Sequence, residues 1–460
     1  MTPFRWSDRE VRRALGLHAG EDEPTYGRVW TDTRSVAEGD LFVALVGERF
    51  DGHDYLHEAA RAGARGAVVA AERADVAADA GLHTYPVQDT LIAFGQLARH
   101  RRRALPARVV GITGSSGKTT TKDLCRAAVG EERRTWATVG NLNNRVGVPR
   151  TLLDAPTDAE VVLVEMGTNL PGEIGILTAI AEPGLGIVTT VGEAHLEGLG
   201  SIEGVLHEKL ALVRGLPEGA TALVGDEPPA LADAARATGR RIRVAGWGAR
   251  ADADLRPVDA HIGGEGGTRW TWQGHDVHLA LPGRAAVTDA LLALGAAREL
   301  GVDGAAAVRG LAGVTASGMR GEVRRLGSLR VIVDCYNANP QSVRAALELL
   351  ATLPHAGARI AVLGSMLELG ERSDALHRAL LDEALRGPID RVVATGAFAI
   401  AAAALPASDR LLVHADVDGL AGRLVATLDG TELVLLKGSR GVRLERVLEP
   451  LTSAFGSREG

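Results

Sequence analysis

The sequence predicts an α/β protein that is divided into three domains. Its 460 residues are enough for two to four domains at a typical size of about 150 residues. Short apolar runs alternate with helical patterns in two stretches, which begin near residues 108 and 330. Such alternation is typical of mainly parallel sheets covered by helices. A stretch of mixed strands and helices precedes them, so we expect domains at residues 1–106, 107–318 and 319–460.

The first boundary follows a basic run that is close to a proline. We interpret Arg101-Arg102-Arg103 as the solvated end of a helix and Pro106 as part of a linker. In the third domain, Asn339 can cap a helix that begins at Pro340 and continues to residue 353. The apolar runs expected to form strands are 109–112, 161–166, 186–191 and 222–224 in the second domain, and 331–333, 360–363, 392–394, 411–413 and 433–436 in the third.

The composition argues against several classes of protein. A net charge of −7 disfavours nucleic-acid binding, which needs basic side chains to displace counterions from phosphates. Cys125 and Cys335 form neither a disulfide framework nor a CxxC zinc pair, as expected in a reducing compartment. No apolar run approaches the roughly 20 residues that span a bilayer, and the first residues lack a secretory signal pattern. We expect a cytoplasmic protein without membrane insertion.

Lysine is rare in this sequence. The chain has 51 basic residues, but its only lysines are Lys118, Lys122, Lys209 and Lys437. Arginine cannot replace lysine as an amine nucleophile or as a compact point charge. Lysines that are retained in so arginine-rich a chain are therefore candidates for functional positions.

A glycine-rich loop after the first strand of the second domain predicts a phosphate-binding site. The segment from Gly111 to Thr120 is Gly-Ile-Thr-Gly-Ser-Ser-Gly-Lys-Thr-Thr. Backbone N–H groups and a helix N-terminus bind anions at such a turn, Lys118 adds positive charge, and the Thr119 hydroxyl can ligate magnesium. Ile112 stands where the strict Walker pattern has glycine, so the loop is a variant. The residues expected to bind the nucleotide are Gly114, Ser115, Ser116, Gly117, Lys118, Thr119 and Thr120.

Glu165, His195 and Lys209 are candidates for a metal site. Glu165 ends an apolar strand, at the edge where open α/β sheets place their sites. Ser201 can cap a helix whose apolar stripe includes Lys209. Burial drives a lysine toward its neutral amine, which can react with carbon dioxide to give a carbamate with two oxygens for a metal. Taken alone, Glu165 is equally compatible with a loop cap, whereas the residues by themselves favour a structural histidine at His195 and a lysine that reaches solvent at Lys209.

These motifs resemble the Mur ligase family, and the resemblance extends over nearly the whole chain. It implies an ATP-driven ligase with two magnesium ions, one bound by Thr119 and Glu165 and the other by His195 and a carbamylated Lys209. It also implies that Arg320 reaches the nucleotide when the domains close. The central residues that carry the resemblance are the loop 114–120, the run Gly140-Asn-Leu-Asn-Asn144, Glu165, and His195 with Lys209 fourteen residues later. The catalytic residues implied are Lys118, Glu165, His195, Lys209 and Asn144, which would orient the γ-phosphate.

Further segments are similar to the MurF type of this family. The runs 31–35 and 40–53 resemble a uridine-diphosphate-sugar-binding domain, which implies that Arg34, Ser35 and Arg49 bind that substrate. The segments 334–340 and 436–441 resemble a Rossmann-like C-terminal domain that binds the amine substrate. The residues implied there are Asn337, Asn339, Lys437 and Arg440.

The resemblance implies a specific reaction. The MurF type adds D-alanyl-D-alanine to UDP-N-acetylmuramoyl-tripeptide through an acyl phosphate, a cytoplasmic step of peptidoglycan precursor synthesis, and we expect a monomer. The chain departs from the family's pattern at Ala285, Ala286 and Asp289, where the family usually has His, Asn and Asn. Those asparagines help to hold ATP, so the departures affect the expected adenine contact.

Other functions remain compatible with parts of the sequence. A MurE-like ligase lacks support because the Asp-Asn-Pro-Arg motif is absent, and a folylpolyglutamate-type ligase does not account for the run 31–53. A catalytically silent ATP-binding homologue is suggested by Ala285, Ala286 and Asp289, although such a protein need not retain Lys118. A phosphate-loop switch or kinase leaves the first and third domains without a role.

Overall fold

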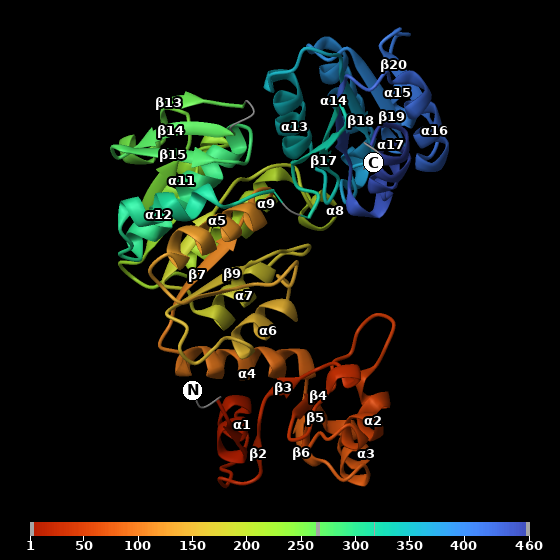
Figure 1. Cartoon of the computed structure of the whole chain (residues 1–460). Coiled ribbons are helices and arrows are strands. Elements are labelled where there is room, and N and C mark those ends of the chain that lie inside the picture. Colours follow the sequence, from red (N-terminus) through yellow and green to blue (C-terminus); the bar gives the residue numbers. More distant parts are fainter. Residues whose placement is uncertain (1–3, 264–266, 317, 457–460) are drawn as a thin grey trace.

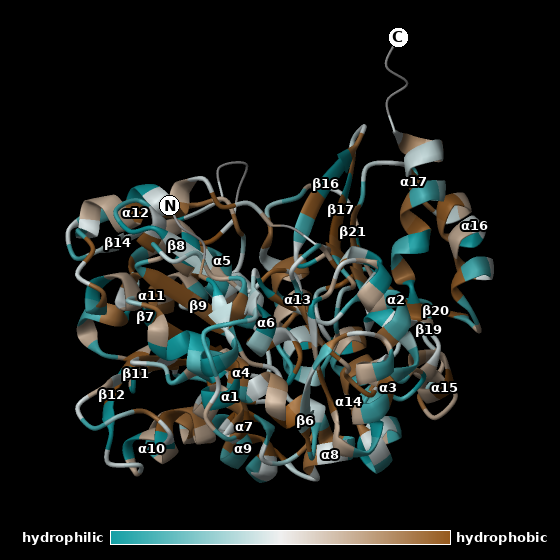
Figure 2. Cartoon of the chain, turned by 90° about the horizontal axis from the view of Figure 1, so that it is seen from below, coloured by the Kyte–Doolittle hydropathy of each residue, from teal (hydrophilic) through white to brown (hydrophobic). Residues whose placement is uncertain are grey.

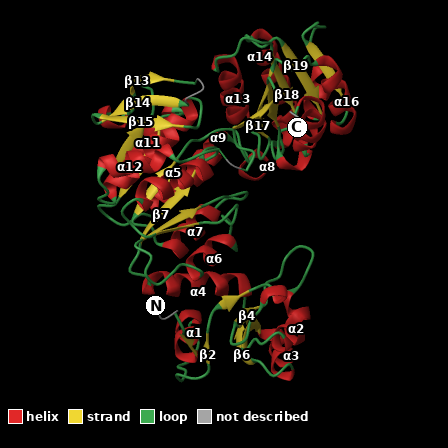
Figure 3. Cartoon of the chain, viewed as in Figure 1, coloured by secondary structure: helices red, strands yellow, loops and turns green. Residues whose placement is uncertain are grey.

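The computed structural model describes residues 4–263, 267–316 and 318–456. Figure 1 shows the N-terminal residues at one end of the molecule, the middle of the chain next to them, and the C-terminal residues beside the middle part, on the side away from the N-terminal end. Each part combines strands with surrounding helices (Figure 3). The predicted α/β class, with mainly parallel sheets, is confirmed.

The N-terminal part contains a parallel sheet with the strand order β3-β4-β5-β6. The loops 31–35 and 44–53 follow the adjacent strands β3 and β4. Because parallel strands end at a common edge, these two loops lie at the same edge of the sheet. The strands are β3 (Val29–Trp30), β4 (Leu41–Val43), β5 (Gly66–Ala70) and β6 (His83–Val87), with a small antiparallel pair, β1 (Trp6–Ser7) and β2 (Thr25–Tyr26). The helices are α1 (Asp8–Leu15), α2 (Leu56–Arg61), α3 (Ala74–Asp79) and α4 (Thr90–Ala104).

The middle part contains a parallel sheet with the order β12-β11-β10-β7-β9-β8. The predicted strands are present, although the strand expected at 186–191 ends at Val188. Sequence patterns missed β8, β12 and an antiparallel sheet, β13-β14-β15. The strands are β7 (Arg108–Thr113), β8 (Thr135–Ala137), β9 (Val161–Glu165), β10 (Leu185–Val188), β11 (Thr221–Gly225), β12 (Arg241–Ala245), β13 (Val258–His261), β14 (Thr268–Trp272) and β15 (His275–Leu279). The helices are α5 (Lys118–Gly130), α6 (Gly147–Leu153), α7 (Glu173–Ala181), α8 (Leu196–Leu199), α9 (Ile202–Arg214), α10 (Pro229–Arg236), α11 (Arg284–Glu299) and α12 (Gly304–Ala312).

The C-terminal part contains a sheet with the order β16-β17-β21-β18-β19-β20, in which only the β16–β17 pairing is antiparallel. Asn339 caps α13 as predicted, because its side-chain oxygen accepts a hydrogen bond from Ser342 N at 2.8 Å. The strands are β16 (Glu322–Leu326), β17 (Leu329–Asp334), β18 (Arg359–Leu363), β19 (Arg391–Thr395), β20 (Leu411–His414) and β21 (Leu433–Lys437). The helices are α13 (Pro340–Thr352), α14 (Ser373–Arg386), α15 (Ala397–Ala402), α16 (Val417–Thr427) and α17 (Leu448–Phe455).

The inner strands form the core of each sheet. Figure 2 shows hydrophobic residues concentrated on strands such as β9 and β17, while more hydrophilic residues lie on the surrounding helices. Every residue of β9 is buried, as expected for a strand covered on both faces. Cys125 and Cys335 are free and buried. Among the helices that the structure describes, none has the length and apolar character needed to cross a bilayer.

The structure corrects the prediction that the basic run at the end of α4 is a solvated helix end. Arg101 is only 2% exposed, and its guanidinium donates to Ala155 O at 2.7 Å. Arg102 Nε donates to Ala181 O at 2.9 Å. The run belongs to the helix, but Arg101 and Arg102 pack against the middle part because their guanidinium groups bind its backbone carbonyls.

Gly111 allows α9 to lie close to β7. A Cβ atom added at Gly111 would lie 2.8 Å from Leu212 Cδ1, and Leu212 is completely buried. Lys209 lies on the same helix, about one turn before Leu212. The absence of a side chain at Gly111 therefore determines how closely α9 can bring Lys209 to the phosphate loop.

We predict that Gly111→Ala lowers the free energy of unfolding by about 1–3 kcal/mol, because the added methyl overpacks the core. Combining it with Leu212→Ala should recover part of that loss, so the two effects should not add. Chemical denaturation measures both. Gly175→Ala in α7 is the control, since nothing lies within 4 Å of its added Cβ; equal destabilisation by both glycine variants would contradict this view of the packing.

Candidate functional site

A cavity of about 870 Å³ lies between the middle and C-terminal parts of the molecule. Its wall combines the phosphate loop, the end of β9 and the segment after β10 with residues of the C-terminal part. The residues that matter most for its chemistry are Lys118, Glu165, His195, Asp334, Asn337 and Lys437. The cavity thus brings together groups that are predicted to bind ATP, metal and amine substrate.

The phosphate loop is held between β10 and α11. Gly114 has φ of +148°, and an added Cβ would lie 2.0 Å from Thr189 Oγ1. Gly117 has φ of +82°, and its Cβ would lie 2.5 Å from Asp289 Oδ1. Both positions therefore require glycine. The backbone N–H groups of Ser115 and Ser116 already donate to Thr190, so the packing uses two of the loop amides that were predicted to face phosphate.

Lys118 and Thr119 open α5 at the mouth of the cavity. Lys118 Nζ donates to Gly114 O at 2.8 Å. Burial lowers the pKa of Lys118, and the nearby Glu165 opposes that shift. Thr120 also lines the cavity. A basic side chain and two hydroxyl side chains therefore lie at the end of the loop, where a triphosphate site is predicted.

Glu165 accepts two hydrogen bonds that orient its carboxylate. Thr119 Oγ1 donates to Glu165 Oε2 at 3.0 Å, and Asn143 Nδ2 donates to Glu165 Oε1 at 2.8 Å. The carboxylate is 2% exposed. The predicted pair Thr119 and Glu165 therefore lies together, and both provide the hard oxygen atoms that magnesium prefers.

Asn143 is a site residue that sequence reasoning missed. The prediction placed Asn144 at the γ-phosphate, but Asn144 Oδ1 accepts from Val146 N and Gly147 N at 3.1 and 2.9 Å. Asn143 lines the cavity instead. The repeated asparagines in this segment gave no local signal that distinguishes the side chain beside Glu165 from the one that caps α6.

Lys209 is a buried amine without a partner. Its side chain is completely buried, and none of the described residues provides a hydrogen-bond partner for Nζ. Burial lowers its pKa well below the usual lysine value, and repulsion by Lys118 adds to that shift. Glu208 opposes that pKa shift only in part, and its two oxygens accept hydrogen bonds from Gly172 N and Ile174 N rather than from Lys209. Burial therefore favours the neutral form of the Lys209 amine.

No set of three His, Cys, Asp or Glu side chains gathers into a metal site within 4–263, 267–316 and 318–456. The predicted ligands are chemically mixed, with the Thr119 hydroxyl, the Glu165 carboxylate, the His195 imidazole and the Lys209 amine. The buried Lys209 amine would provide oxygen ligands if it became a carbamate. With Lys209 carbamylated, this set of ligands fits magnesium.

Asp289 is buried beneath the phosphate loop. Its Oδ1 accepts a hydrogen bond from Thr121 Oγ1 at 3.0 Å. Burial raises its pKa to about 8, and the bond from Thr121 opposes the shift only in part. Burial therefore favours the protonated form of Asp289, at the position where asparagine was expected from the resemblance.

The C-terminal part adds two groups of residues to the cavity. Asn339 Nδ2 donates to Ser115 O at 3.3 Å and to Ser116 Oγ at 3.2 Å, so the cap of α13 also contacts the phosphate loop. Lys437 is 1% exposed. Its Nζ lies 2.9 Å from Asp334 Oδ2 and donates to Asn337 O at 2.7 Å.

Arg320 and Arg440 differ in their relation to the cavity. Arg320 lines it and stacks over the Tyr336 ring, with 3.8 Å between the guanidinium carbon and the ring centroid. Arg440 pairs with Glu445 at 2.8 Å and is not among the cavity residues. Arg320 therefore lies in the wall of the cavity, whereas Arg440 lies outside it.

The predicted uridine-diphosphate residues lie in the N-terminal part. Arg34 pairs with Asp32 at 2.7 Å and is 85% exposed. Ser35 Oγ accepts from Trp30 Nε1 at 2.9 Å, and Arg49 is exposed on the loop after β4. These residues share one sheet edge, away from the nucleotide cavity, so they could bind a different portion of a long substrate.

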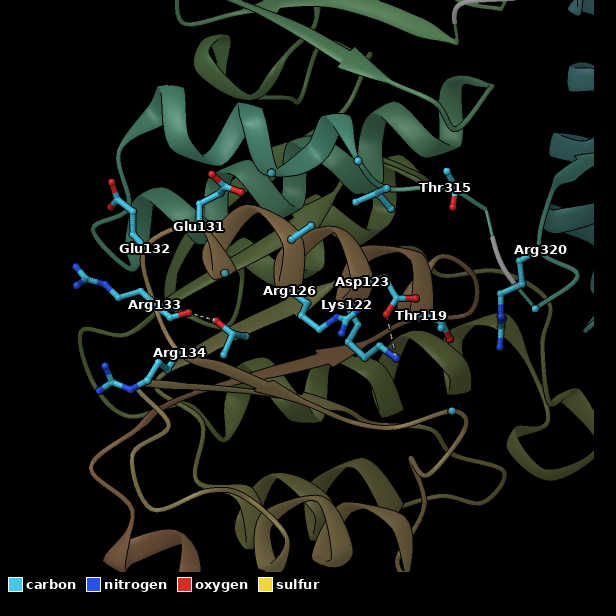
Figure 4. A pocket seen from close by; sticks show the side chains of 18 of the residues that line it. Thr119, Lys122, Asp123, Arg126, Glu131, Glu132, Arg133, Arg134, Thr315 and Arg320 are labelled. Carbon is cyan, nitrogen blue, oxygen red and sulfur yellow. Dashed lines mark hydrogen bonds and ion pairs between the residues drawn. The ribbon is translucent and has the colours of Figure 1, made fainter. Parts of the chain in front are cut away.

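A groove of about 1250 Å³ runs from the phosphate loop along α5. Figure 4 shows Thr119 and Arg320 at one end, with Asp123 and Arg126 farther along and the segment 131–134 at the other end. Thr119 and Arg320 line both this groove and the nucleotide cavity. The two spaces therefore meet at the point where phosphate chemistry is predicted.

Comparison with known proteins agrees with this architecture. Three domain families match: the Mur ligase family catalytic domain at residues 25–102, the Mur ligase middle domain at 112–297, and the Mur ligase glutamate ligase domain at 319–440. The UDP-N-acetylmuramoyl-tripeptide–D-alanyl-D-alanine ligase of Bacillus subtilis is 36% identical over 432 residues, with 92% of each chain covered. The Escherichia coli ligase of the same name is 35% identical, with 93% of this chain and 94% of that protein covered.

Solved structures give the same result. The crystal structure of MurF from Acinetobacter baumannii has a TM-score of 0.87 and 28% identity, covering 98% of this chain and 100% of that one. The MurF ligase from Thermotoga maritima in complex with ADP has a TM-score of 0.80 and 30% identity, covering 93% and 97%. By its domains, its relatives and its fold, this chain belongs to the Mur ligase family.

Proposed function

We propose that this chain is the ligase that joins UDP-N-acetylmuramoyl-tripeptide to D-alanyl-D-alanine, with conversion of ATP to ADP and phosphate. The observation that carries this proposal is the cavity in which the phosphate loop faces Asp334, Asn337 and Lys437 of the C-terminal part. Relatives of this name, matched over more than nine-tenths of their length, support the choice of substrates.

The proposed reaction has two steps. An oxygen of the peptide carboxylate attacks the γ-phosphorus of ATP, and the P–O bond to ADP breaks to give an acyl phosphate. The amine of D-alanyl-D-alanine then attacks the acyl carbon, the C–O bond to phosphate breaks, and the amine loses a proton. Positioning and charge neutralisation provide most of the catalysis in phosphoryl transfer, and they fall here to Lys118 and Arg320.

The proposed metal ligands are Thr119 and Glu165 for one magnesium ion, and His195 and carbamylated Lys209 for a second. Bound magnesium would neutralise phosphate charge as it accumulates. For the carbamate, the neutral Lys209 amine forms an N–C bond with carbon dioxide and releases one proton. The lack of a hydrogen-bond partner for Lys209 Nζ supports this assignment, since a carbamate at this buried position would be bound by the metal ion.

The remaining substrate residues are proposed by region. Arg34, Ser35 and Arg49 would hold the uridine diphosphate, while Asn337 and Lys437 would face the dipeptide. The cap role of Asn144 and the position of Arg440 make these two less direct participants than the sequence suggested. We further propose residues 1–106, 107–318 and 319–460 as the uridine-nucleotide, ATP-binding and amine-binding domains of a cytoplasmic monomer.

Replacing Lys118 should strongly slow phosphoryl transfer. We expect Lys118→Ala to lower kcat/KM by about 100-fold to 1000-fold, a usual result of removing one group that stabilises transition-state charge. Phosphate release is measured with UDP-N-acetylmuramoyl-tripeptide, with and without D-alanyl-D-alanine. Arg309→Ala on the exposed face of α12 is the control and should retain activity. A wild-type protein that binds ATP without turnover would instead indicate a silent homologue.

A variant at Lys209 should regain activity when a small carboxylate is added. Lys209→Ala removes the amine that would carry the carbamate, so acetate or formate can enter the vacated space and supply oxygen ligands. Activity is titrated against each anion, and the unfolding midpoint shows that the variant is folded. Lys118→Ala receives the same treatment and should not recover. A fully active Lys209→Ala protein, or a folded inactive one that no anion rescues, would contradict the proposed carbamate.

The affinity for ATP should fall as pH rises through about 8. Burial raises the pKa of Asp289 to about 8, so ionisation above that pH places a negative charge beneath the triphosphate loop. Because the pKa of Asp289 is higher in the folded protein than in the unfolded chain, the stability of the fold should also decrease as pH rises toward 8. Calorimetric titration with ATP should show the fall in wild type but not in Asp289→Asn. Asp123→Asn is the control, and a pH dependence unchanged by Asp289→Asn would refute the assignment.

A further inference from the structure

A contact between two parts of the molecule holds the histidine that is proposed to bind metal. His195 precedes α8 in the middle part, and Glu368 lies in the C-terminal part between β18 and the short helix η5 (Gly370–Arg372). Glu368 Oε2 lies 2.6 Å from His195 Nδ1. In addition, Glu197 N donates to Glu368 O at 3.2 Å. Both the side chain and the backbone of Glu368 therefore contact the segment that carries His195.

Both residues adopt an uncommon backbone conformation. The φ angles are +54° at His195 and +63° at Glu368, in the left-handed region that few non-glycine residues occupy. Such conformations persist only where surrounding contacts impose them, and they gather at functional sites. Two residues in this conformation that face each other across the boundary indicate a constraint on their relative position.

The segment that carries Glu368 is anchored from within the C-terminal part. Met366 N donates to Nε2 of the buried His377 at 2.9 Å, and Leu367 N donates to Ser439 Oγ at 3.0 Å. Glu368 itself remains 53% exposed on its side chain. The carboxylate therefore projects from a fixed backbone toward His195 and contributes little to the core.

The contact has a direct consequence for metal binding. A histidine that binds a metal through one ring nitrogen usually donates the other N–H to a carboxylate or carbonyl, which sets its tautomer and orientation. Here Nδ1 faces Glu368, and His195 lines the nucleotide cavity, so Nε2 is the nitrogen left for a ligand. We propose that Glu368 is a positioning residue that fixes His195 for metal binding through Nε2, so that the metal site is complete only when the C-terminal part is docked.

This proposal rests on the metal role proposed for His195 and deepens it. Nearby contacts provide a matched control, because Glu193 lies 3.7 Å from Arg372 and 3.9 Å from Arg344 across the same boundary. Arg372→Ala therefore removes one exposed ionic contact of the same boundary, of the kind that contributes little to docking, and leaves the His195 ring untouched. A purely structural role for Glu368 predicts that Glu368→Ala and Arg372→Ala behave alike.

The test measures Mn²⁺ binding to the full chain by electron paramagnetic resonance, in the presence of a non-hydrolysable ATP analogue. His195→Ala identifies the ion that depends on the imidazole. For that ion, Glu368→Ala should weaken binding by about 10-fold to 100-fold, as is usual for the loss of such a partner. Glu368→Gln, which keeps a side-chain oxygen near Nδ1 but loses the charge, should weaken it less, and Arg372→Ala should bind as wild type does.

Coupling between the two residues decides the mechanism. If Glu368 acts through His195, adding Glu368→Ala to His195→Ala should cause no further loss of Mn²⁺ affinity. An additional loss in the double variant, or equal effects of Glu368→Ala and Arg372→Ala, would overturn the proposal. Unchanged Mn²⁺ binding in His195→Ala would overturn it together with the metal role of His195. The ligase assay on wild-type protein tests the proposed reaction separately.

Discussion

The close packing of the phosphate loop between the exit of β10 and the start of α11 determines the geometry of the whole site. Gly114 and Gly117 have no room for a side chain, because Thr189 and Asp289 occupy the space where a Cβ would lie. The loop therefore has little freedom to move away from the sheet. Its position in turn fixes Lys118 and Thr119 at the start of α5, and through Thr119 it fixes the carboxylate of Glu165.

Charge burial is the second constraint, and it follows from the first. The packed loop brings Lys118 close to Glu165, while α9 places Lys209 beneath them without a partner. Two amines buried near each other disfavour their charged forms, whereas a triphosphate with its metal ions would favour the charge on Lys118. The site is therefore electrostatically suited to an anionic ligand, and the carbamate would balance the remaining amine.

Much of the fold and part of the site could be predicted because the signals are local. The strand, glycine loop and helix from Arg108 to Gly130 follow one another in the sequence, and Ser201 and Asn339 cap helices through neighbouring residues. The prediction for Arg101 failed because its burial depends on a carbonyl in a distant segment. Glu368 could not be found in the same way, since only the docking of two sheets brings it to His195.

Predictions from the sequence failed where the outcome depends on which of two neighbouring side chains reaches the site, or on contacts between domains. Asn143 and Asn144 have the same chemistry, and only the turn into α6 decides which amide reaches Glu165. Arg440 belongs to a segment near the cavity, but its pairing with Glu445 directs it elsewhere. Local sequence thus indicates which chemistry is present, whereas packing decides which of several similar groups performs it.

In the proposed reaction, one cavity activates a carboxylate with ATP and then transfers the acyl group to an amine. The most direct measurement follows oxygen from UDP-N-acetylmuramoyl-tripeptide whose terminal carboxylate carries ¹⁸O. If an acyl phosphate forms and breaks at its C–O bond, each phosphate released with peptide-bond formation contains one oxygen from that carboxylate. Phosphate without the label, formed together with the new peptide bond, would contradict the account.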